Sequence, residues 1–125
     1  MTSVLAVDDS AFMRQMLAST LRAAGYDVIE AVDGMDALDK LRTHPVDVVL
    51  TDQNMPRMDG LELTRQLRSQ ERWRHLPVLI LTTEAGDAVK QAGRDAGATG
   101  WLLKPFDPAR LIKTLYLVAH RAQEN

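Results

Sequence analysis

The sequence has no cysteine, no excess of basic residues and no long apolar run, and each absence removes a class of function. Without cysteine there is no disulfide framework, no thiolate zinc site and no cysteine nucleophile. A formal net charge of -2 argues against nucleic-acid binding, which favours strongly basic domains. The amino-terminal segment has neither a basic start nor an apolar stretch long enough for a signal peptide or a membrane span. We therefore expect a cytoplasmic protein that does not insert into a membrane.

Length and composition indicate one globular domain. The chain has 125 residues, of which 46% are hydrophobic and 26% are charged. This composition can form a real core, and the length leaves little room for a second domain. No repeat or linker interrupts the chain, so we predict a single domain over residues 1–125.

Apolar runs alternate with amphipathic segments along the chain, five times over. Some of the apolar runs are continuous rather than alternating, which is typical of strands buried on both faces of a parallel sheet. Strands are predicted at residues 4–7, 27–31, 46–51, 78–81 and 100–103, and helices at 10–24, 34–43, 60–68, 87–96 and 109–120. This alternation predicts a doubly wound α/β domain with a parallel sheet of five strands and five helices.

Local signals mark the helix ends and the buried faces. Asp33, Asp59 and Asp107 each precede a predicted helix and are candidate caps. Phe12 and Met16 stand at helical spacing among the apolar residues of the first helix, so we expect them on its buried face.

Some other side chains have ordinary structural explanations. Arg68 lies in a run of charges of alternating sign, and we expect it on a solvated helix face. Met55 and Met58 are expected to fill the core, with exposure to a partner as the alternative.

Four of the five apolar runs end in a conspicuous polar residue. These residues are Asp8 and Asp9 after the first run, Asp52 after the third, Thr82 after the fourth and Lys104 after the fifth. In an open α/β sheet, sites form outside the carboxyl ends of the strands. We therefore expect these side chains to converge, although they are far apart in sequence.

The chemistry of such a cluster points to phosphoryl transfer. Two carboxylates ~4 Å apart repel each other by about 4 kcal/mol at an effective dielectric constant of 20. A divalent cation removes that cost, and oxygen ligands without histidine or thiol favour Mg²⁺. A carboxylate near Mg²⁺ and Lys104 stays ionised and can act as a nucleophile. The cation, Lys104 and the Thr82 hydroxyl can neutralise or bind the oxygens of an incoming phosphoryl group.

These residues, together with the run Asp-Gln-Asn-Met-Pro-Arg-Met-Asp-Gly at 52–60, resemble the receiver domain of two-component response regulators. The match spans the chain. The runs at 82–84 and 97–106 resemble more narrowly the CheY-type chemotaxis regulators, which are stand-alone receivers. The resemblance implies a flavodoxin-like fold and a phosphoacceptor switch with intrinsic autodephosphorylation, not an enzyme that turns over a substrate.

The resemblance also implies which residues accept the phosphoryl group and bind the metal. Asp52 would take the group from a phosphohistidine on a sensor histidine kinase, and Lys104 would pair with it. Asp9 and Asp52 would bind Mg²⁺, with Asp8 acting directly or through water. The backbone carbonyl of Asn54 would supply a further ligand.

Other positions correspond to the switch and to its tuning. Thr82 would swing toward the phosphoryl group, and the peptide bond before Pro105 is expected to be cis. Trp101 stands where the family most often has tyrosine or phenylalanine. Because indole is larger and offers only an N–H donor, we expect a smaller displacement that still reports activation. Asn54 and Glu84 would tune the access of water to the phosphoryl group.

The resemblance leaves the output open. A protein target such as the flagellar motor switch or a phosphatase would bind the face formed by residues 87–96, 100–103 and 109–120. The main alternative is a phosphate sink or phosphorelay intermediate without a direct target. A second alternative is a receiver excised from a longer regulator.

Three other classes of protein fit less well. A flavin-binding protein of this architecture needs a phosphate loop after the first strand, where Asp8 and Asp9 would repel phosphate. The nucleotide-binding motif G-x-x-x-x-G-K-[ST] is missing. A magnesium-dependent phosphatase with an aspartyl nucleophile usually has a second acid where Asn54 stands.

Overall fold

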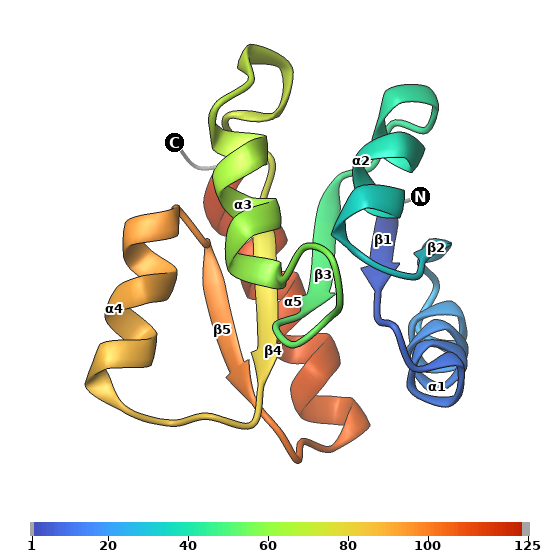
Figure 1. The fold of residues 1–125 in the computed structure, drawn as a ribbon. Coiled ribbons are helices and arrows are strands. Elements are labelled where there is room, and N and C mark those ends of the chain that lie inside the picture. Colours follow the sequence, from blue (N-terminus) through green and yellow to red (C-terminus); the bar gives the residue numbers. More distant parts are fainter. Residues whose placement is uncertain (1, 124–125) are drawn as a thin grey trace.

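A parallel sheet of five strands forms the centre of the molecule, in the order β2-β1-β3-β4-β5 (Figure 1). The computed structural model describes residues 2–123, and the side chains of residues 2–120. The strands are β1 (Ser3–Val7), β2 (Asp27–Ala31), β3 (Val48–Asp52), β4 (Val78–Thr82) and β5 (Gly100–Leu103). All neighbouring strands pair in parallel, so their carboxyl ends meet at one edge of the sheet.

The five predicted helices are present. They are α1 (Ala11–Ala23), α2 (Gly34–Thr43), α3 (Gly60–Arg68), α4 (Asp87–Ala96) and α5 (Pro108–Gln123). A short 3₁₀ helix, η1 (Glu71–Trp73), was not predicted. The doubly wound α/β architecture is thereby confirmed. Among the described residues, no helix has the length and apolar character needed to cross a membrane.

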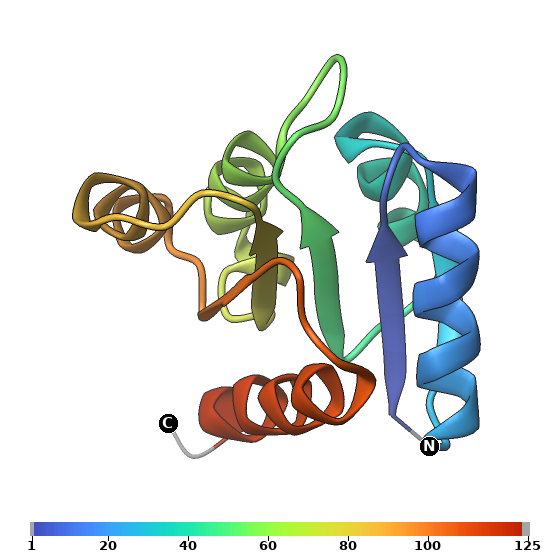
Figure 2. The same cartoon turned by 90° about the horizontal axis from the view of Figure 1, so that it is seen from below.

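The sheet separates two apolar cores. Val4 and Ala6 of β1 face the core that α1 and α5 cover, whereas Leu5 and Val7 face the core under α2 and α3. Figure 2 shows α5 on one side of the sheet and α2 and α3 on the other. Because alternate residues of a strand point to opposite faces, both faces need apolar side chains. This is why the central strands read as continuous apolar runs.

The capping predictions are confirmed. Asp33 Oδ1 accepts a hydrogen bond from the Asp36 backbone N–H at 2.9 Å, and Asp59 Oδ1 accepts one from Glu62 at 2.8 Å. Asp107 Oδ1 accepts from the Arg110 N–H at 2.6 Å. These bonds satisfy N–H groups that have no partner inside the helix, and they fix where each helix begins.

Two expectations about α1 and β3 are wrong. Phe12 is 70% exposed and Met16 is 49% exposed, because these two residues, four positions apart, lie on the face of α1 opposite Leu17 and Leu21, which are buried. Strand β3 begins at Val48, two residues later than predicted, and it includes Asp52.

Arg68 is not on a solvated face, contrary to expectation. Its Nε donates to the Gly97 carbonyl at 2.9 Å and its Nη1 to the Trp73 carbonyl at 3.1 Å. Burial lowers the pKa of its guanidinium. Arg68 thus joins the carboxyl ends of α4 and η1 to α3.

Met55 and Met58 are partly buried and pack against the core under α2 and α3, as expected of core filler.

Helix α4 is held more loosely than the other helices. It lies beside β5 at one end of the sheet (Figure 1) and packs mainly against α3. Its buried residues are Gly93 and Ala96, and its first turn has no side-chain cap at Gly86. Few apolar contacts and an uncapped start make a helix easy to displace.

Candidate functional site

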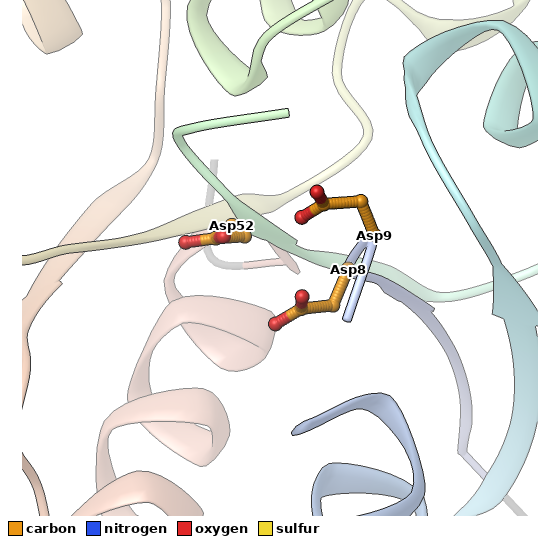
Figure 3. Close-up of side chains that lie close together, drawn as sticks. All are labelled: Asp8, Asp9 and Asp52. Atoms are coloured by element: carbon orange, nitrogen blue, oxygen red, sulfur yellow. The ribbon is translucent and has the colours of Figure 1, made fainter. Parts of the chain in front are cut away.

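Three carboxylates gather at the carboxyl ends of β1 and β3 (Figure 3). Asp8 and Asp9 follow β1, and Asp52 is the last residue of β3, the strand beside it. One ligand atom from each of the three lies within 4.8 Å of the others. The predicted convergence of these residues is therefore observed.

Asp8 is buried without full compensation for its charge. Its side chain is almost inaccessible, Oδ1 accepts from the Ser10 N–H at 2.9 Å, and Oδ2 has no hydrogen-bond partner. Burial raises the pKa of this carboxyl; the charges of Asp52 and Asp9 act in the same direction, and Lys104 opposes them. A buried oxygen without a partner is costly unless a ligand satisfies it.

Asp52 is paired with the lysine that follows β5. Lys104 Nζ donates to Asp52 Oδ1 at 2.9 Å, and both side chains are largely buried. The Gln53 N–H donates to the same oxygen at 3.1 Å. These donors hold the carboxylate in one orientation, and a carboxylate oxygen is a group that can attack an electrophile.

Thr82 ends β4, and its hydroxyl is buried near the same edge of the sheet. Its Oγ1 accepts a hydrogen bond from the Glu84 N–H at 3.1 Å. The hydroxyl proton is therefore free to be donated elsewhere. Lys104 N–H also donates to the Thr82 carbonyl at 2.7 Å, which joins the loops after β4 and β5.

The donor set fits a hard divalent cation. It consists of carboxylate oxygens, and the described residues bring no histidine or thiol to the cluster. Asp8 Oδ2 is already buried and unsatisfied, as an oxygen that awaits a cation would be. A cation there would also relieve the mutual repulsion of Asp8, Asp9 and Asp52.

The family model of the response regulator receiver domain matches residues 4–116 of the chain. The chain is a response-regulator receiver domain. Receivers take a phosphoryl group from histidine kinases onto an aspartate, and they act as signalling switches in two-component systems.

Similar proteins place this receiver near those of chemotaxis signalling. The chemotaxis protein CheY1 of Helicobacter pylori is 40% identical over 117 residues, which cover 92% of this chain and 94% of that protein. A Campylobacter jejuni CheY homologue is 40% identical over 90% of this chain and 88% of its own. The structure of Vibrio cholerae CheY4 is 49% identical with a TM-score of 0.90, and the match covers 94% of this chain and 98% of that one.

A further solved structure bears on the metal. It is the receiver domain of a sensor histidine kinase from Pseudomonas aeruginosa, described with a magnesium ion coordinated in its active-site cleft. It is 30% identical, with a TM-score of 0.86, over 95% of this chain and 98% of its own.

The remaining predicted site residues lie in the loops after β3, β4 and β5 and on β5 itself. Asn54 and Glu84 are exposed in the loops after β3 and β4. The peptide bond before Pro105 is cis, as predicted. Trp101 on β5 is partly buried against the core under α2 and α3, and its indole N–H is buried without a partner.

One contact between the loops after β2 and β3 does not follow from the sequence. Arg57 pairs with Asp33, which had been interpreted only as a cap. The two residues lie 24 positions apart on different loops, and nothing local in the sequence indicates that they meet.

Proposed function

We propose that Asp52 accepts a phosphoryl group from a histidine kinase in a magnesium-dependent reaction. The chain would work as a stand-alone receiver, one domain over residues 1–125, in the cytoplasm of a cell that uses it for chemotaxis. That span includes residues 1, 124 and 125, which lie outside the described residues. The observation that carries the proposal is the buried, unsatisfied oxygen of Asp8 beside the Asp52–Lys104 ion pair.

Asp8, Asp9, Asp52 and the backbone carbonyl of Asn54 would hold Mg²⁺. The relative from Pseudomonas aeruginosa, with magnesium in its active-site cleft, supports this assignment. Bound there, the ion would supply positive charge against the oxygens of the phosphoryl group. The cost of holding Asp8 ionised in a buried position suits this role, because it is removed when a cation binds.

The reacting groups of the chain have distinct tasks. An Asp52 carboxylate oxygen attacks phosphorus while the P–N bond of the phosphohistidine breaks, and its electron pair goes to the imidazole. Lys104 Nζ, now 2.9 Å from Asp52 Oδ1, then pairs with a phosphoryl oxygen. The Thr82 hydroxyl donates its proton, which the hydrogen bond from the Glu84 N–H does not use, to another phosphoryl oxygen. Each charge-assisted bond contributes roughly 1.5–3 kcal/mol.

These bonds give the switch its driving force. Moving a two-state equilibrium from 1:99 to 99:1 needs about 5.5 kcal/mol. Two or three charge-assisted bonds that exist in one arrangement of the loops are of that order. The readout face is formed by α4, β5 and α5, with the flagellar motor switch or a phosphatase as the kind of target. A phosphate sink without a direct target is the alternative.

The switch would reset by hydrolysis of its own acyl phosphate. Asn54 and Glu84 are exposed on the two loops that flank Asp52 and Thr82. Polar side chains there leave water a path to the phosphorus. We therefore propose intrinsic autodephosphorylation, tuned by these two positions, and no turnover of an external substrate.

A fluorescence titration tests the proposed site. Mg²⁺ and then beryllofluoride, an analogue of the acyl phosphate, are added to the parent protein and to Asp52→Asn. We expect Mg²⁺ to change the tryptophan emission of the parent, and beryllofluoride to change it further only with Mg²⁺ present. Asp52→Asn should give no beryllofluoride response. A response in Asp52→Asn equal to that of the parent would place the acceptor elsewhere.

A further inference from the structure

The loop after β3 contains a turn that an arginine adopts only at a cost. Arg57 has a φ of +68°, in the left-handed region that favours glycine. The Met58 N–H donates to the Pro56 carbonyl at 2.7 Å, so the turn is tight and centred on Arg57. A side chain there costs roughly 1 kcal/mol or more. Something outside the turn must stabilise this conformation.

The stabilising contact comes from the start of α2. Arg57 Nε lies 2.8 Å from Asp33 Oδ2, and Nη2 contacts the same oxygen. The other Asp33 oxygen caps α2 through the Asp36 N–H. Burial alone would raise the pKa of Asp33, but the Asp36 N–H and the Arg57 guanidinium outweigh it and lower that pKa. The carboxylate is therefore ionised at neutral pH and its two oxygens are both used.

A second contact fixes the same part of the loop. A Cβ on Gly34, the first residue of α2, would lie 2.7–2.8 Å from Met58 side-chain atoms. Met58 therefore occupies the space that a side chain at position 34 would need. The tip of the loop is thus attached to α2 by an ion pair and by close packing.

The strand order shows what this attachment spans. In the order β2-β1-β3, β1 lies between the other two strands. Asp33 follows β2 and Arg57 follows β3, whereas Asp8 and Asp9 follow β1. The Arg57–Asp33 pair therefore joins the loops on either side of Asp8 and Asp9. Asn54, the predicted source of a carbonyl ligand, lies on the Arg57 side.

We propose that Arg57 is a positioning residue for the metal site, which it holds in shape through its ion pair with Asp33. The ion pair fixes the loop of residues 53–59, so that the Asn54 carbonyl stands at its place beside Asp52 without reorganisation. This inference rests on the proposed function and identifies a residue that supports it. Mutation of residues that hold metal ligands in place commonly lowers metal affinity 10–100-fold.

The sign of the effect separates positioning from simple electrostatics. Arg57 is a cation, so by charge alone its removal would lower the repulsion of Mg²⁺ and tighten binding. Loss of positioning has the opposite effect, because a loop that must be ordered on binding weakens affinity. Removal of the Arg57 charge is therefore expected to weaken binding although it makes the site more negative.

The chain offers a matched control. Arg42 on α2 also pairs with an aspartate, Asp39, and its side chain is 60% exposed against 61% for Arg57. Arg42→Gln removes the same charge at the same exposure, but its partner lies on the same helix. Asp33→Asn is a second variant that keeps a capping oxygen on α2 and loses the ion pair.

Calorimetric titration with Mg²⁺ alone, at a temperature where each variant is folded by circular dichroism, tests the proposal. We expect Arg57→Gln and Asp33→Asn to raise the Kd for Mg²⁺ by about 10-fold. Arg57→Lys should keep most of the affinity of the parent. The double variant, with both Arg57→Gln and Asp33→Asn, should bind Mg²⁺ little more weakly than whichever of the two single variants binds it more weakly. Arg42→Gln should leave the Kd unchanged or slightly lower.

Two results would overturn the positioning role. One is a Kd for Arg57→Gln equal to that of Arg42→Gln, and the other is tighter binding in Arg57→Gln than in the parent. Either result, with a parent that binds Mg²⁺, would leave the proposed function standing. A parent that does not bind Mg²⁺ would overturn the proposed function and this inference with it.

Discussion

Asp8 shows at the scale of one residue how a functional site costs stability. Its carboxylate is buried, one oxygen has no partner, and burial raises its pKa. A carboxyl whose pKa is raised in the folded state destabilises the metal-free fold at pH values above that pKa. The free energy of unfolding rises again as the pH falls through the raised pKa, because the protonated carboxyl carries no charge. Residues of functional sites commonly lower the stability of the fold in this way.

Replacement of Asp8 by asparagine should therefore stabilise the metal-free protein. The amide is neutral, it can still accept from the Ser10 N–H, and its NH₂ group can donate to the neighbouring carboxylates. We expect the free energy of unfolding in urea to rise by ~1 kcal/mol at pH 7 in the presence of a chelator. The gain should shrink as the pH falls through the pKa of Asp8.

The same variant should lose the stabilisation that Mg²⁺ gives to the parent. A ligand that binds the native state stabilises it by RT ln(1 + [L]/Kd), about 2.7 kcal/mol at 100 times Kd. Asp39→Asn, an exposed carboxylate on α2, is the control and should change neither quantity. If Asp8→Asn is less stable than the parent without metal, the assignment of a strained, metal-ready carboxylate is wrong.

At the scale of elements, the contact between β5 and α4 bears on whether Trp101 moves when the protein is activated. A Cβ on Gly93 of α4 would lie 3.0 Å from Cε3 and Cζ3 of Trp101. The indole thus occupies the space beside a helix residue that has no side chain. Because the ring lies against Gly93, we expect a displacement of Trp101 to move α4 with it.

Gly93→Ala should separate α4 from Trp101. The added methyl group must push the ring or the helix by a few tenths of an ångström, whereas alanine favours the helix itself by up to ~1 kcal/mol. We expect the protein to stay folded and the tryptophan emission to shift to longer wavelength, as the ring gains access to water. The response to Mg²⁺ and beryllofluoride should be smaller than in the parent.

Gln91→Ala, on the exposed face of α4, is the control for helix propensity. It should leave both the emission and the response unchanged. A Gly93→Ala spectrum identical to that of the parent, in both states, would show that Trp101 and α4 are not coupled.

The elements also show what the sequence could and could not predict. The bounds of α2 and α3 follow from Asp33 and Asp59, because a cap acts within one turn of helix. The prediction that Phe12 is buried is wrong, because α1 has apolar residues on more than one face and the spacing alone does not say which face meets the sheet. Arg57–Asp33 and Arg68–Gly97 join residues 24 and 29 positions apart, and only the folded chain brings them together.

For the whole molecule, the parallel sheet places the site and the readout face on connected elements. All five strands run in one direction, so residues from four of them meet at one edge without being close in sequence. Lys104 follows β5 and Thr82 ends β4, and these two strands pair with each other. Charge placed on Asp52 can therefore act on the loops that carry α4 and α5. This connection makes a switch of the whole domain feasible.

Phosphotransfer from a small-molecule donor tests whether Asp52 is the magnesium-dependent phosphoacceptor. Intact mass would be measured after incubation with acetyl phosphate, for the parent with Mg²⁺, the parent with a chelator, and Asp52→Asn with Mg²⁺. We expect the mass of one added phosphoryl group on the parent with Mg²⁺ and no added mass in the other two samples. Equal labelling of Asp52→Asn, or labelling of the parent that does not depend on Mg²⁺, would contradict it.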